Sequence, residues 1–427
     1  MQDTDHLGRP IIVVTGVGLI TSLGQGTDAN WRALTAGKSG IHRITRFPVD
    51  GMRTTMAGTV DFIPVAVPSA PAMSERLAEL VIEEAVTQAA IGQPGDFPGP
   101  LFLALPPVEM EWPQRLALAA ESGARDTVTY DDLLRAAGSG DHHAYYERFL
   151  FASVGENLAS RFGTRGTPIA TSTACASGGT AIQLGVEAIR RGETESALVV
   201  GTDASVNPES LIRFSLLSAL STRNDSPETA SRPFAKDRDG FIMSEGAGAL
   251  VLESLTHARA RGATILGVIE GCGEAADGFH RTRSSPDGKP IIACMRNALD
   301  DAGLTPDDVG YINAHGTSTP ENDKMEWVGV SAVFGARASS IPISSNKSMI
   351  GHTLTAAGAI EAIFTLLTVR HGLLPPTINY DTPDPAVPVD CVPNVARAAV
   401  VSHAISNSFG FGGQNVCVVI GAAPGRS

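Results

Sequence analysis

Residues 168–192 read PIATSTACASGGTAIQLGVEAIRRG, an apolar segment followed by small residues and then by apolar residues at helical spacing. This order predicts a strand, a tight turn and a helix that begins near Ser177 and stops at Gly192. Cys175 lies in the turn among small and hydroxylated neighbours, whereas an unreactive cysteine normally lies among Leu, Ile and Val. The positive end of the helix dipole would favour its thiolate. The stretch fits a nucleophile and a buried structural thiol equally well.

Short apolar strands alternate with helical segments along the rest of the chain, which favours an α/β fold. Further strands are expected at 11–21 and 196–203, and further helices at 27–36 and 74–90. The order of strand, small-residue turn and buried helix recurs at 341–371. This recurrence predicts two similar halves in one large unit.

The domain boundaries follow from the same pattern. We place a first half at residues 1–258, which contains Cys175, and a second half at 259–427. The segment near 101–151 is richer in charged and aromatic residues, and we interpret it as a cap or insertion in the first half.

Composition limits the kind of protein. The chain has 427 residues, 43% apolar and 18% charged, which is ordinary for a globular enzyme. We see neither a signal peptide nor a run of ~20 apolar residues, so we expect a cytoplasmic protein without a membrane span. Five widely spaced cysteines argue for a reducing compartment and against a disulfide framework or a zinc site. A net charge of −13 disfavours nucleic acid as a partner.

Two further segments contain candidate catalytic side chains. His315 follows an expected strand in YINAHGTSTP, and Lys347, His352 and Glu361 surround the start of the small-residue helix in the second half. A lone histidine is more often structural than catalytic, but two histidines at strand-to-turn positions favour catalysis beside a candidate thiol. Near the C-terminus, the glycines of NSFGFGGQN would let backbone N–H groups approach a substrate.

Taken together, these segments resemble the β-ketoacyl-acyl-carrier-protein synthases, specifically the long-chain condensing enzymes known as type II ketosynthases. The resemblance covers most of the chain, in the order of the family. The matching motifs are VVTGVGLITSLG, TACASG, ALSTRNDSPETASRPFAKDRDGF, SEGAGALVLE, INAHGTSTPENDK, SSNKSMIGHTLTAAGAIEA, PPTIN and NSFGFGGQN.

The resemblance implies a fold and a reaction. The fold would be the thiolase fold, with two βαβ-rich halves in five α/β/α/β/α layers, usually as a homodimer. The chain would be an acyltransferase of fatty-acid biosynthesis. Cys175 would take an acyl chain from acyl-carrier protein, and malonyl-carrier protein would then lose CO2 and condense with it, giving a 3-oxoacyl chain two carbons longer. No cofactor or metal is implied beyond the phosphopantetheine of the carrier protein.

The resemblance also implies a role for each matching residue. His315 and His352 would stabilise the enolate, and the backbone amides of Cys175 and Phe411 would form the oxyanion hole. The remaining implied residues are the ion pair Lys347 and Glu361 beside the histidines, Asp323 in support, Thr317 and Thr319 on the phosphopantetheine arm, and Phe214 and Phe411 at the acyl pocket. Glu361 could equally form an architectural salt bridge, and both phenylalanines could be plain core.

The sequence departs from the family in two places. Pro106, Pro107 and Glu109 stand where relatives have a glycine-rich segment near the acyl pocket. Basic residues that would dock an acidic carrier are scarce before the 74–90 helix, where Arg76 stands alone, so Arg281 and Arg283 become candidates. Both departures suggest a specialised carrier or acyl substrate, such as a very long chain.

Four other functions can be compared with the motifs of this sequence. A polyketide-type ketosynthase is compatible with the same motifs. A non-catalytic partner of the chain-length-factor kind typically lacks the cysteine, so Cys175 with both histidines argues against it. A thiolase would need a second cysteine near the C-terminus, and Cys417 has the pattern of a strand residue. A dinucleotide-binding site is disfavoured because TGVGLITSLG breaks the GxGxxG pattern.

Overall fold

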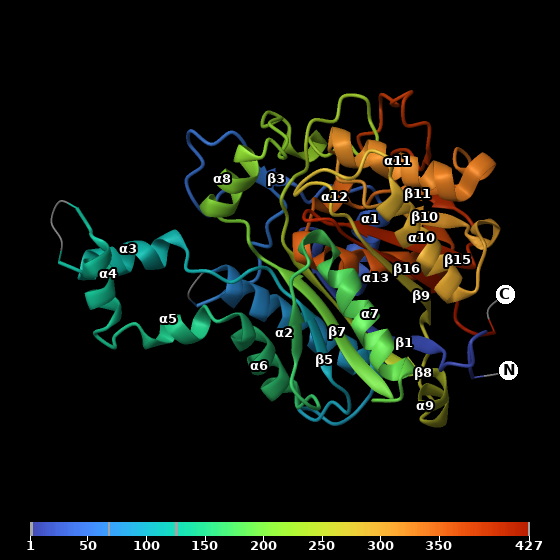
Figure 1. Cartoon of the computed structure of the whole chain (residues 1–427), viewed down its shortest axis with the longest axis horizontal. Coiled ribbons are helices and arrows are strands. Elements are labelled where there is room, and N and C mark those ends of the chain that lie inside the picture. The colour runs from blue at the N-terminus through green and yellow to red at the C-terminus, as the bar shows by residue number, and fades with distance from the viewer. Residues whose placement is uncertain (1–2, 67–68, 124–126, 426–427) are drawn as a thin grey trace.

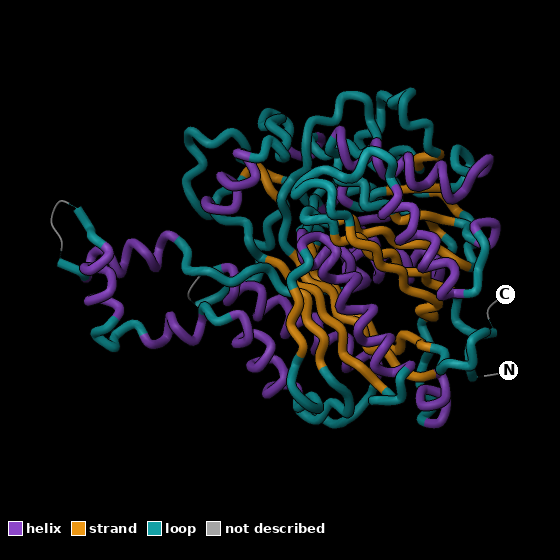
Figure 2. Tube along the Cα trace, in the orientation of Figure 1, coloured by secondary structure: helices purple, strands orange, loops and turns teal. Residues whose placement is uncertain are grey.

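The computed structural model of the chain describes residues 3–66, 69–123 and 127–425. Its centre is a continuous twelve-stranded sheet flanked by helices, with an arm of three short helices projecting from the body (Figures 1 and 2). In spatial order, the strands are β6 (Ile169–Thr171), β5 (Leu101–Ala104), β7 (Ser196–Asp203), β8 (Gly246–Ser254), β1 (Ile12–Thr21), β9 (Gly267–Ala276), β16 (Gln414–Gly421), β15 (His403–Phe409), β10 (Tyr311–Asn313), β11 (Pro342–Ser344) and β13 (Asp390–Cys391), with β2 (Gly24–Gln25) paired to β1.

The sheet contains the same five-strand pattern twice. β6, β5 and β7 run parallel, and β8 and β1 then pair antiparallel. Likewise β11, β10 and β15 run parallel, and β16 and β9 then pair antiparallel. The two sets join where the start of β1 pairs with the start of β9. The repeated order places the segment after β6 and the segment after β11 at equivalent positions.

Helices form the remaining layers. The central pair is α7 (Ser177–Arg190) and α13 (Ala357–His371), which pack against each other. On the outer faces lie α2 (Ala70–Ala89), which packs on β1, β7 and β8, and α10 (Lys289–Ala302), which packs on β9 and β16. The other helices are α1 (Thr27–Thr35), α6 (Phe151–Phe162), α8 (Pro208–Leu216), α9 (Leu255–Ala260), α11 (Pro320–Phe334) and α12 (Lys347–Ile350). The two halves of the sheet lie on either side of α7 and α13, with α2 and α10 outside them. This gives the five expected layers, α/β/α/β/α.

Glycine permits the close contact between α7 and α13. A Cβ atom on Gly178 would lie 2.4 Å from the Ala359 amide nitrogen, and one on Gly358 would lie 2.4 Å from the Gly179 amide nitrogen. Side chains at these positions would force the helices apart. The two helices therefore begin close together, with the segments that precede them.

One expected boundary differs from the structure. The sequence pattern predicts a helix from residue 74, but α2 begins at Ala70. Ser69 accepts a hydrogen bond from the Ala72 amide and Pro71 occupies the first turn, so a normal cap lies upstream of the apolar periodicity. Among the described helices, none is long and apolar enough to cross a membrane.

The projecting arm follows β5. It contains α3 (Trp112–Glu121), α4 (Tyr130–Ala137) and α5 (His143–Arg148), at the left of Figure 1. β5 itself lies inside the sheet, so the arm occupies residues after 104 rather than the whole of 101–151. Its large apolar side chains include several that are exposed: Trp112, Leu116, Tyr130, Leu134 and Tyr146.

Candidate active site

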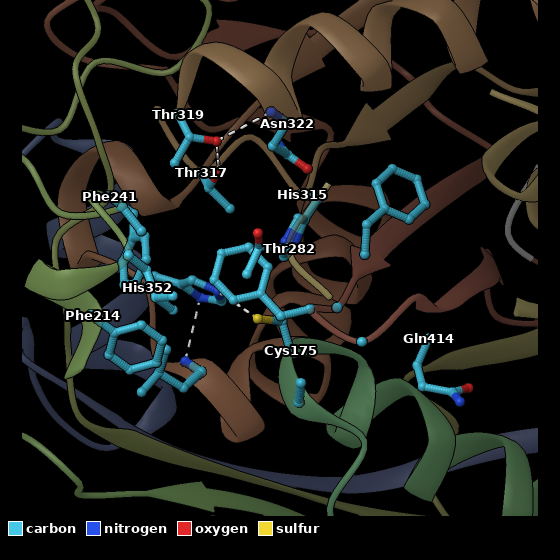
Figure 3. A pocket seen from close by; sticks show the side chains of 18 of the residues that line it. Cys175, Phe214, Phe241, Thr282, His315, Thr317, Thr319, Asn322, His352 and Gln414 are labelled. Carbon is cyan, nitrogen blue, oxygen red and sulfur yellow. Dashed lines mark hydrogen bonds between the residues drawn. The ribbon is translucent and has the colours of Figure 1, made fainter. Parts of the chain in front are cut away.

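A cavity of about 1250 Å³ opens among the loops that follow β6, β10, β11 and β15. Cys175, His315 and His352 all line it, although they come from distant parts of the chain (Figure 3). One side-chain donor atom from each lies within 4.8 Å of the others. The structure thus brings together the three residues that the sequence singled out.

Cys175 and His352 lie beside corresponding turns of the two halves, although Thr355 is the residue at the position of Cys175. Cys175 lies in a single 3-10 turn between β6 and α7, and His352 precedes a similar turn before α13. Ala174 and Leu354 in these turns have φ angles of 49° and 47°, a left-handed conformation that is uncommon for residues with a side chain. The result is a distance of 3.0 Å between the Cys175 Sγ and the His352 Nε2.

A backbone contact determines which nitrogen of His352 carries the proton. The Leu354 amide donates to the His352 Nδ1 at 3.3 Å, so this nitrogen acts as an acceptor. In a neutral imidazole the proton then lies on Nε2, which faces the Cys175 sulfur. Burial, and to a lesser extent the positive charge of Lys347, lower the pKa of His352 well below its usual value, so the ring is neutral.

The thiol itself is protonated in the resting site. Burial raises the pKa of Cys175 to about 11, although a hydrogen bond from the Phe411 amide and the charge of Lys347 act in the opposite direction. The helix terminus favours the thiolate, as expected, but the desolvation of a buried thiol outweighs the dipole. Negative charge on the sulfur must develop during the reaction, next to the His352 Nε2–H.

His315 is held by a buried ion pair. The Lys347 ammonium lies 3.4 Å from the His315 Nδ1 and contacts the Glu361 carboxylate. Both Lys347 and Glu361 are 1% exposed. Lysine can only donate, so the His315 Nδ1 accepts and its Nε2 carries the proton. Burial and the nearby Lys347 lower the pKa of His315 well below its usual value, while burial raises the pKa of Glu361 to about 7 against the influence of Lys347.

The loop that contains His315 is fixed by Glu326, a residue that the sequence analysis missed. The Glu326 carboxylate accepts from the His315 amide at 2.9 Å and the Gly316 amide at 2.7 Å. The Asn407 side chain donates to the same carboxylate at 3.0 Å. The available signal was helical spacing, since Glu326 lies three residues after Asp323 on α11 and both are buried.

Asp323 does not face the cavity. Its carboxylate accepts from the Phe234 amide at 2.8 Å and lies 3.5 Å from the Arg238 Nε. Burial raises its pKa, and Arg238 opposes the rise. The structure thus places Asp323 as a support for the chain beneath the site.

Two threonines line the cavity at the start of α11. The Thr317 and Thr319 hydroxyls are 3.0 Å apart, and the Thr319 hydroxyl caps α11 by accepting from the Asn322 amide at 3.2 Å. Figure 3 shows them above Cys175, with Phe214 at the left of the view. The cavity lining therefore reaches from the thiol both to the threonines and to Phe214.

The two phenylalanines also line the cavity instead of lying in the core. Phe214 packs edge-on against Phe241, with ring centroids 5.3 Å apart, and Phe241 packs edge-on against His352 at the same spacing. Phe411 is partly exposed, and its amide donates to the Cys175 sulfur. The Phe411 amide is therefore a backbone N–H donor beside the thiol.

A cysteine with two histidines is also a donor set suited to a transition metal. The hydrogen bond from the Leu354 amide opposes that use, because it leaves the proton on the His352 nitrogen that would have to coordinate the ion. The arrangement instead brings two N–H donors and a thiol together in a buried part of the cavity. Such a site suits attack on a thioester and stabilisation of negative oxygen.

Comparisons with known proteins point the same way. Residues 10–73 and 117–258 match the N-terminal domain of β-ketoacyl synthases, and residues 266–381 match the C-terminal domain. The chain is 37% identical over 414 residues to the 3-oxoacyl-[acyl-carrier-protein] synthase 2 of Coxiella burnetii, covering 96% of this chain and 98% of that one. It is 35% identical to the tetracenomycin polyketide synthase ketoacyl synthase alpha subunit of Streptomyces glaucescens, covering 96% of each.

Among solved structures, the chain is similar to a type II polyketide synthase complex, AntDE:AntF. That structure is described as an acyl-carrier protein in complex with its ketosynthase bound to the hexaketide. The TM-score is 0.86 at 31% identity, and the match covers 97% of this chain and 100% of that one. The expected thiolase-type fold is thereby confirmed.

Proposed function

From the premise that this chain belongs to the β-ketoacyl synthase family and condenses chains bound to acyl-carrier protein, we propose that Cys175 is the residue that takes up the acyl chain. One observation supports the assignment most strongly. The Cys175 Sγ lies 3.0 Å from the His352 Nε2, within a cavity that also presents His315 and the Phe411 amide.

The first step is transfer of the acyl group. The Cys175 sulfur attacks the carbonyl carbon of the acyl-carrier thioester, a new C–S bond forms, and the bond to the phosphopantetheine sulfur breaks. The thiol proton passes to the departing sulfur, so charge balances over the step. The His352 Nε2–H stabilises charge on the Cys175 sulfur, and the amides of Cys175 and Phe411 stabilise the tetrahedral oxyanion.

The second step is decarboxylative condensation. The bond between the malonyl methylene carbon and its carboxylate breaks, CO2 leaves, and the electron pair passes to the thioester oxygen as an enolate. The Nε2–H groups of His315 and His352 converge on the position of that oxygen. The enolate carbon then attacks the acyl-Cys175 carbonyl, and Cys175 leaves as the free thiol after it regains a proton. The product is a 3-oxoacyl chain longer by two carbons.

Lys347 and Glu361 act through His315. The Lys347 contact keeps the His315 Nδ1 in its acceptor role, and the charge of Glu361 balances that of Lys347 in the buried site. We propose Lys347 and Glu361 as positioning residues, Asp323 and Glu326 as supports of the loop, and Thr317 and Thr319 as partners of the phosphopantetheine arm that the carrier protein brings.

The chain is proposed to elongate fatty-acyl chains, with a specialised substrate. The names of the matching relatives include both 3-oxoacyl-[acyl-carrier-protein] synthases and polyketide ketosynthases, so a polyketide-type activity is the second candidate. The ion pair of Glu109 and Arg213 in the cavity wall favours this second candidate. The presence of Cys175 disfavours the non-catalytic chain-length-factor kind. The five free cysteines support a cytoplasmic location.

We also propose a homodimer that uses the projecting arm. On α4, Tyr130 and Leu134 are spaced four residues apart and are 75% and 52% exposed, and Leu116 on α3 is 67% exposed. Apolar side chains gathered on one arm mark a protein interface.

The variant Leu116→Glu/Leu134→Glu should lower the mass measured by light scattering from twice 44.4 kDa to that of a monomer. Val400→Glu, at an apolar residue that is 95% exposed, should remain dimeric. A wild-type monomer would contradict the proposal.

The two chemical steps can be tested separately with His315→Ala. Because His352 contacts the Cys175 sulfur through its Nε2 and, within the described chain, His315 has no hydrogen bond to it, acylation measured by intact mass should stay within about threefold of wild type, whereas CO2 release from malonyl-carrier protein should fall by about 10²–10³-fold. His143→Ala, at an exposed histidine on the arm, is the control and should affect neither step. Equal losses in both steps would count against separate roles for the histidines.

A further inference from the structure

The cavity wall beside Phe214 contains an ion pair. Arg213 on α8 and Glu109, which lies between β5 and α3, both line the cavity. The Arg213 Nη2 lies 2.9 Å from the Glu109 Oε2, and its Nη1 contacts the other carboxylate oxygen. The two residues are 104 positions apart in sequence, so the fold itself brings them together. The pair is bidentate, the strongest geometry for an arginine and a carboxylate.

The position of this pair relates it to the acyl chain. Arg213 immediately precedes Phe214, which Figure 3 shows apart from Thr317 and Thr319, in a different direction from the Cys175 sulfur. If the phosphopantetheine arm occupies the threonine side, an acyl chain on Cys175 extends toward Phe214 and then toward the ion pair. The same cavity is also lined by the apolar residues Pro106, Pro107 and Leu217.

A pocket for a plain hydrocarbon chain would be lined by apolar side chains throughout. The Arg213 and Glu109 side chains are 54% and 41% exposed. A hydrocarbon that reaches them would remove water from two charged groups without replacing the hydrogen bonds to that water, which is unfavourable. An oxygenated chain avoids this penalty. The guanidinium has five N–H donors, of which Glu109 receives two, so others are available to a carbonyl or hydroxyl oxygen. The Ser205 and Ser210 residues line the same region and add polar surface.

We propose that Glu109 and Arg213 select acyl chains that carry carbonyl or hydroxyl oxygens in their distal part over saturated hydrocarbon chains of the same length. This selectivity rests on the proposed function, since it takes Cys175 as the point of attachment. Glu109 holds Arg213 against the wall and offsets its charge, so the site recognises neutral oxygens in preference to a second carboxylate. Glu109 and Arg213 thus determine specificity without taking part in the chemical steps.

The test compares matched acyl thioesters on a single carrier protein. Chains of equal length, saturated or with one distal carbonyl, are offered to the enzyme, and kcat/KM for acylation of Cys175 is measured for each. Wild type should favour the oxygenated chain by about tenfold or more. Glu109→Leu/Arg213→Leu should reduce this ratio to about one, chiefly by improving the saturated chain.

Two further variants keep the proposal testable if the double leucine variant fails to fold. Glu109→Gln keeps the polar wall but leaves Arg213 uncompensated, so chains with a distal carboxylate should become better substrates. Arg115→Leu removes an arginine that lies 3.5 Å from Glu109 outside the cavity lining, and should leave the wild-type ratio intact. Equal kcat/KM for both chains in wild type, or an unchanged ratio in the double leucine variant, would overturn the proposal. Failure to acylate Cys175 with any chain would instead overturn the proposed function.

Discussion

Lys347 shows how a single buried charge controls two histidines. Its ammonium is 1% exposed, contacts Glu361, and lies 3.4 Å from the His315 Nδ1. A buried cation is costly unless it is paired, and Glu361 supplies the partner of Lys347. Burial, and then the charge of Lys347, lower the pKa values of His315 and His352, so both rings are neutral with their Nε2–H groups available as donors.

The variant Lys347→Met tests this electrostatic role. Removing a nearby cation stabilises an imidazolium, so the pKa of His315 should rise, although burial will keep it below the usual value. NMR titration of the histidine Cε1–H signals, assigned with His315→Ala, should show the midpoint moving to higher pH. Lys289→Met, which removes an exposed lysine paired with Asp287, should leave it in place. A His315 midpoint that falls or stays fixed in Lys347→Met would contradict the account.

At the scale of elements, the site depends on two helices that begin side by side. α7 and α13 follow equivalent strands in the repeated sheet pattern, and the glycine contacts at Gly178 and Gly358 set their separation. Cys175 and His352 lie just before the two helix starts. The separation of the helices therefore determines the distance between the thiol and the imidazole.

Gly358→Ala tests that dependence. The added Cβ would lie 2.4 Å from the Gly179 amide nitrogen, a backbone atom that can move only with its helix. We expect the free energy of unfolding to fall by about 1–3 kcal/mol in urea denaturation and acylation of Cys175 to slow by about tenfold or more. Gly278→Ala serves as the matched control, because its Cβ would meet nothing within 4 Å. Unchanged acylation in a folded Gly358→Ala variant would show that the helix spacing is not critical.

The sequence was informative where chemistry and local pattern coincide. Strand β7 occupies 196–203 as expected, and Cys175, His315 and His352 were found because each lies in a turn of small residues. Glu326 escaped notice because its partners are backbone amides and a distant Asn407 side chain, which no local pattern reveals. The raised pKa of Cys175 escaped too, because burial depends on the packing of the whole site.

At the scale of the whole molecule, the distribution of charge constrains carrier docking. The chain has a net charge of −13, and the arginines near α2 are already paired with acidic side chains: Arg76 with Glu79, Arg148 with Glu75, and Arg161 with Glu79 and Glu83. Arg283 lines the cavity and Arg281 lies two residues before it; within the described chain neither forms an ion pair. Lys324 lines the same opening. An acidic carrier protein would be attracted to this group of cations.

Arg281→Glu/Arg283→Glu should therefore weaken docking without affecting chemistry. We expect KM for acyl-carrier protein to rise by about tenfold or more, with a smaller salt dependence than in wild type. The same acyl group on free pantetheine should react at the wild-type rate, because it does not need the carrier. Arg191→Glu, at an exposed arginine paired with Glu193, is the control. An equal loss with carrier-bound and free pantetheine thioesters would assign these arginines to the pocket rather than to docking.

The central claim is that Cys175 is the acylated nucleophile, and intact-mass spectrometry tests it most directly. The protein is incubated with acyl-carrier protein, and wild type is compared with Cys175→Ala, which retains the other four cysteines. We predict that wild type gains the mass of one acyl group and that folded Cys175→Ala gains none. Acylation of the alanine variant, or a folded wild type that is acylated by no chain, would contradict the account.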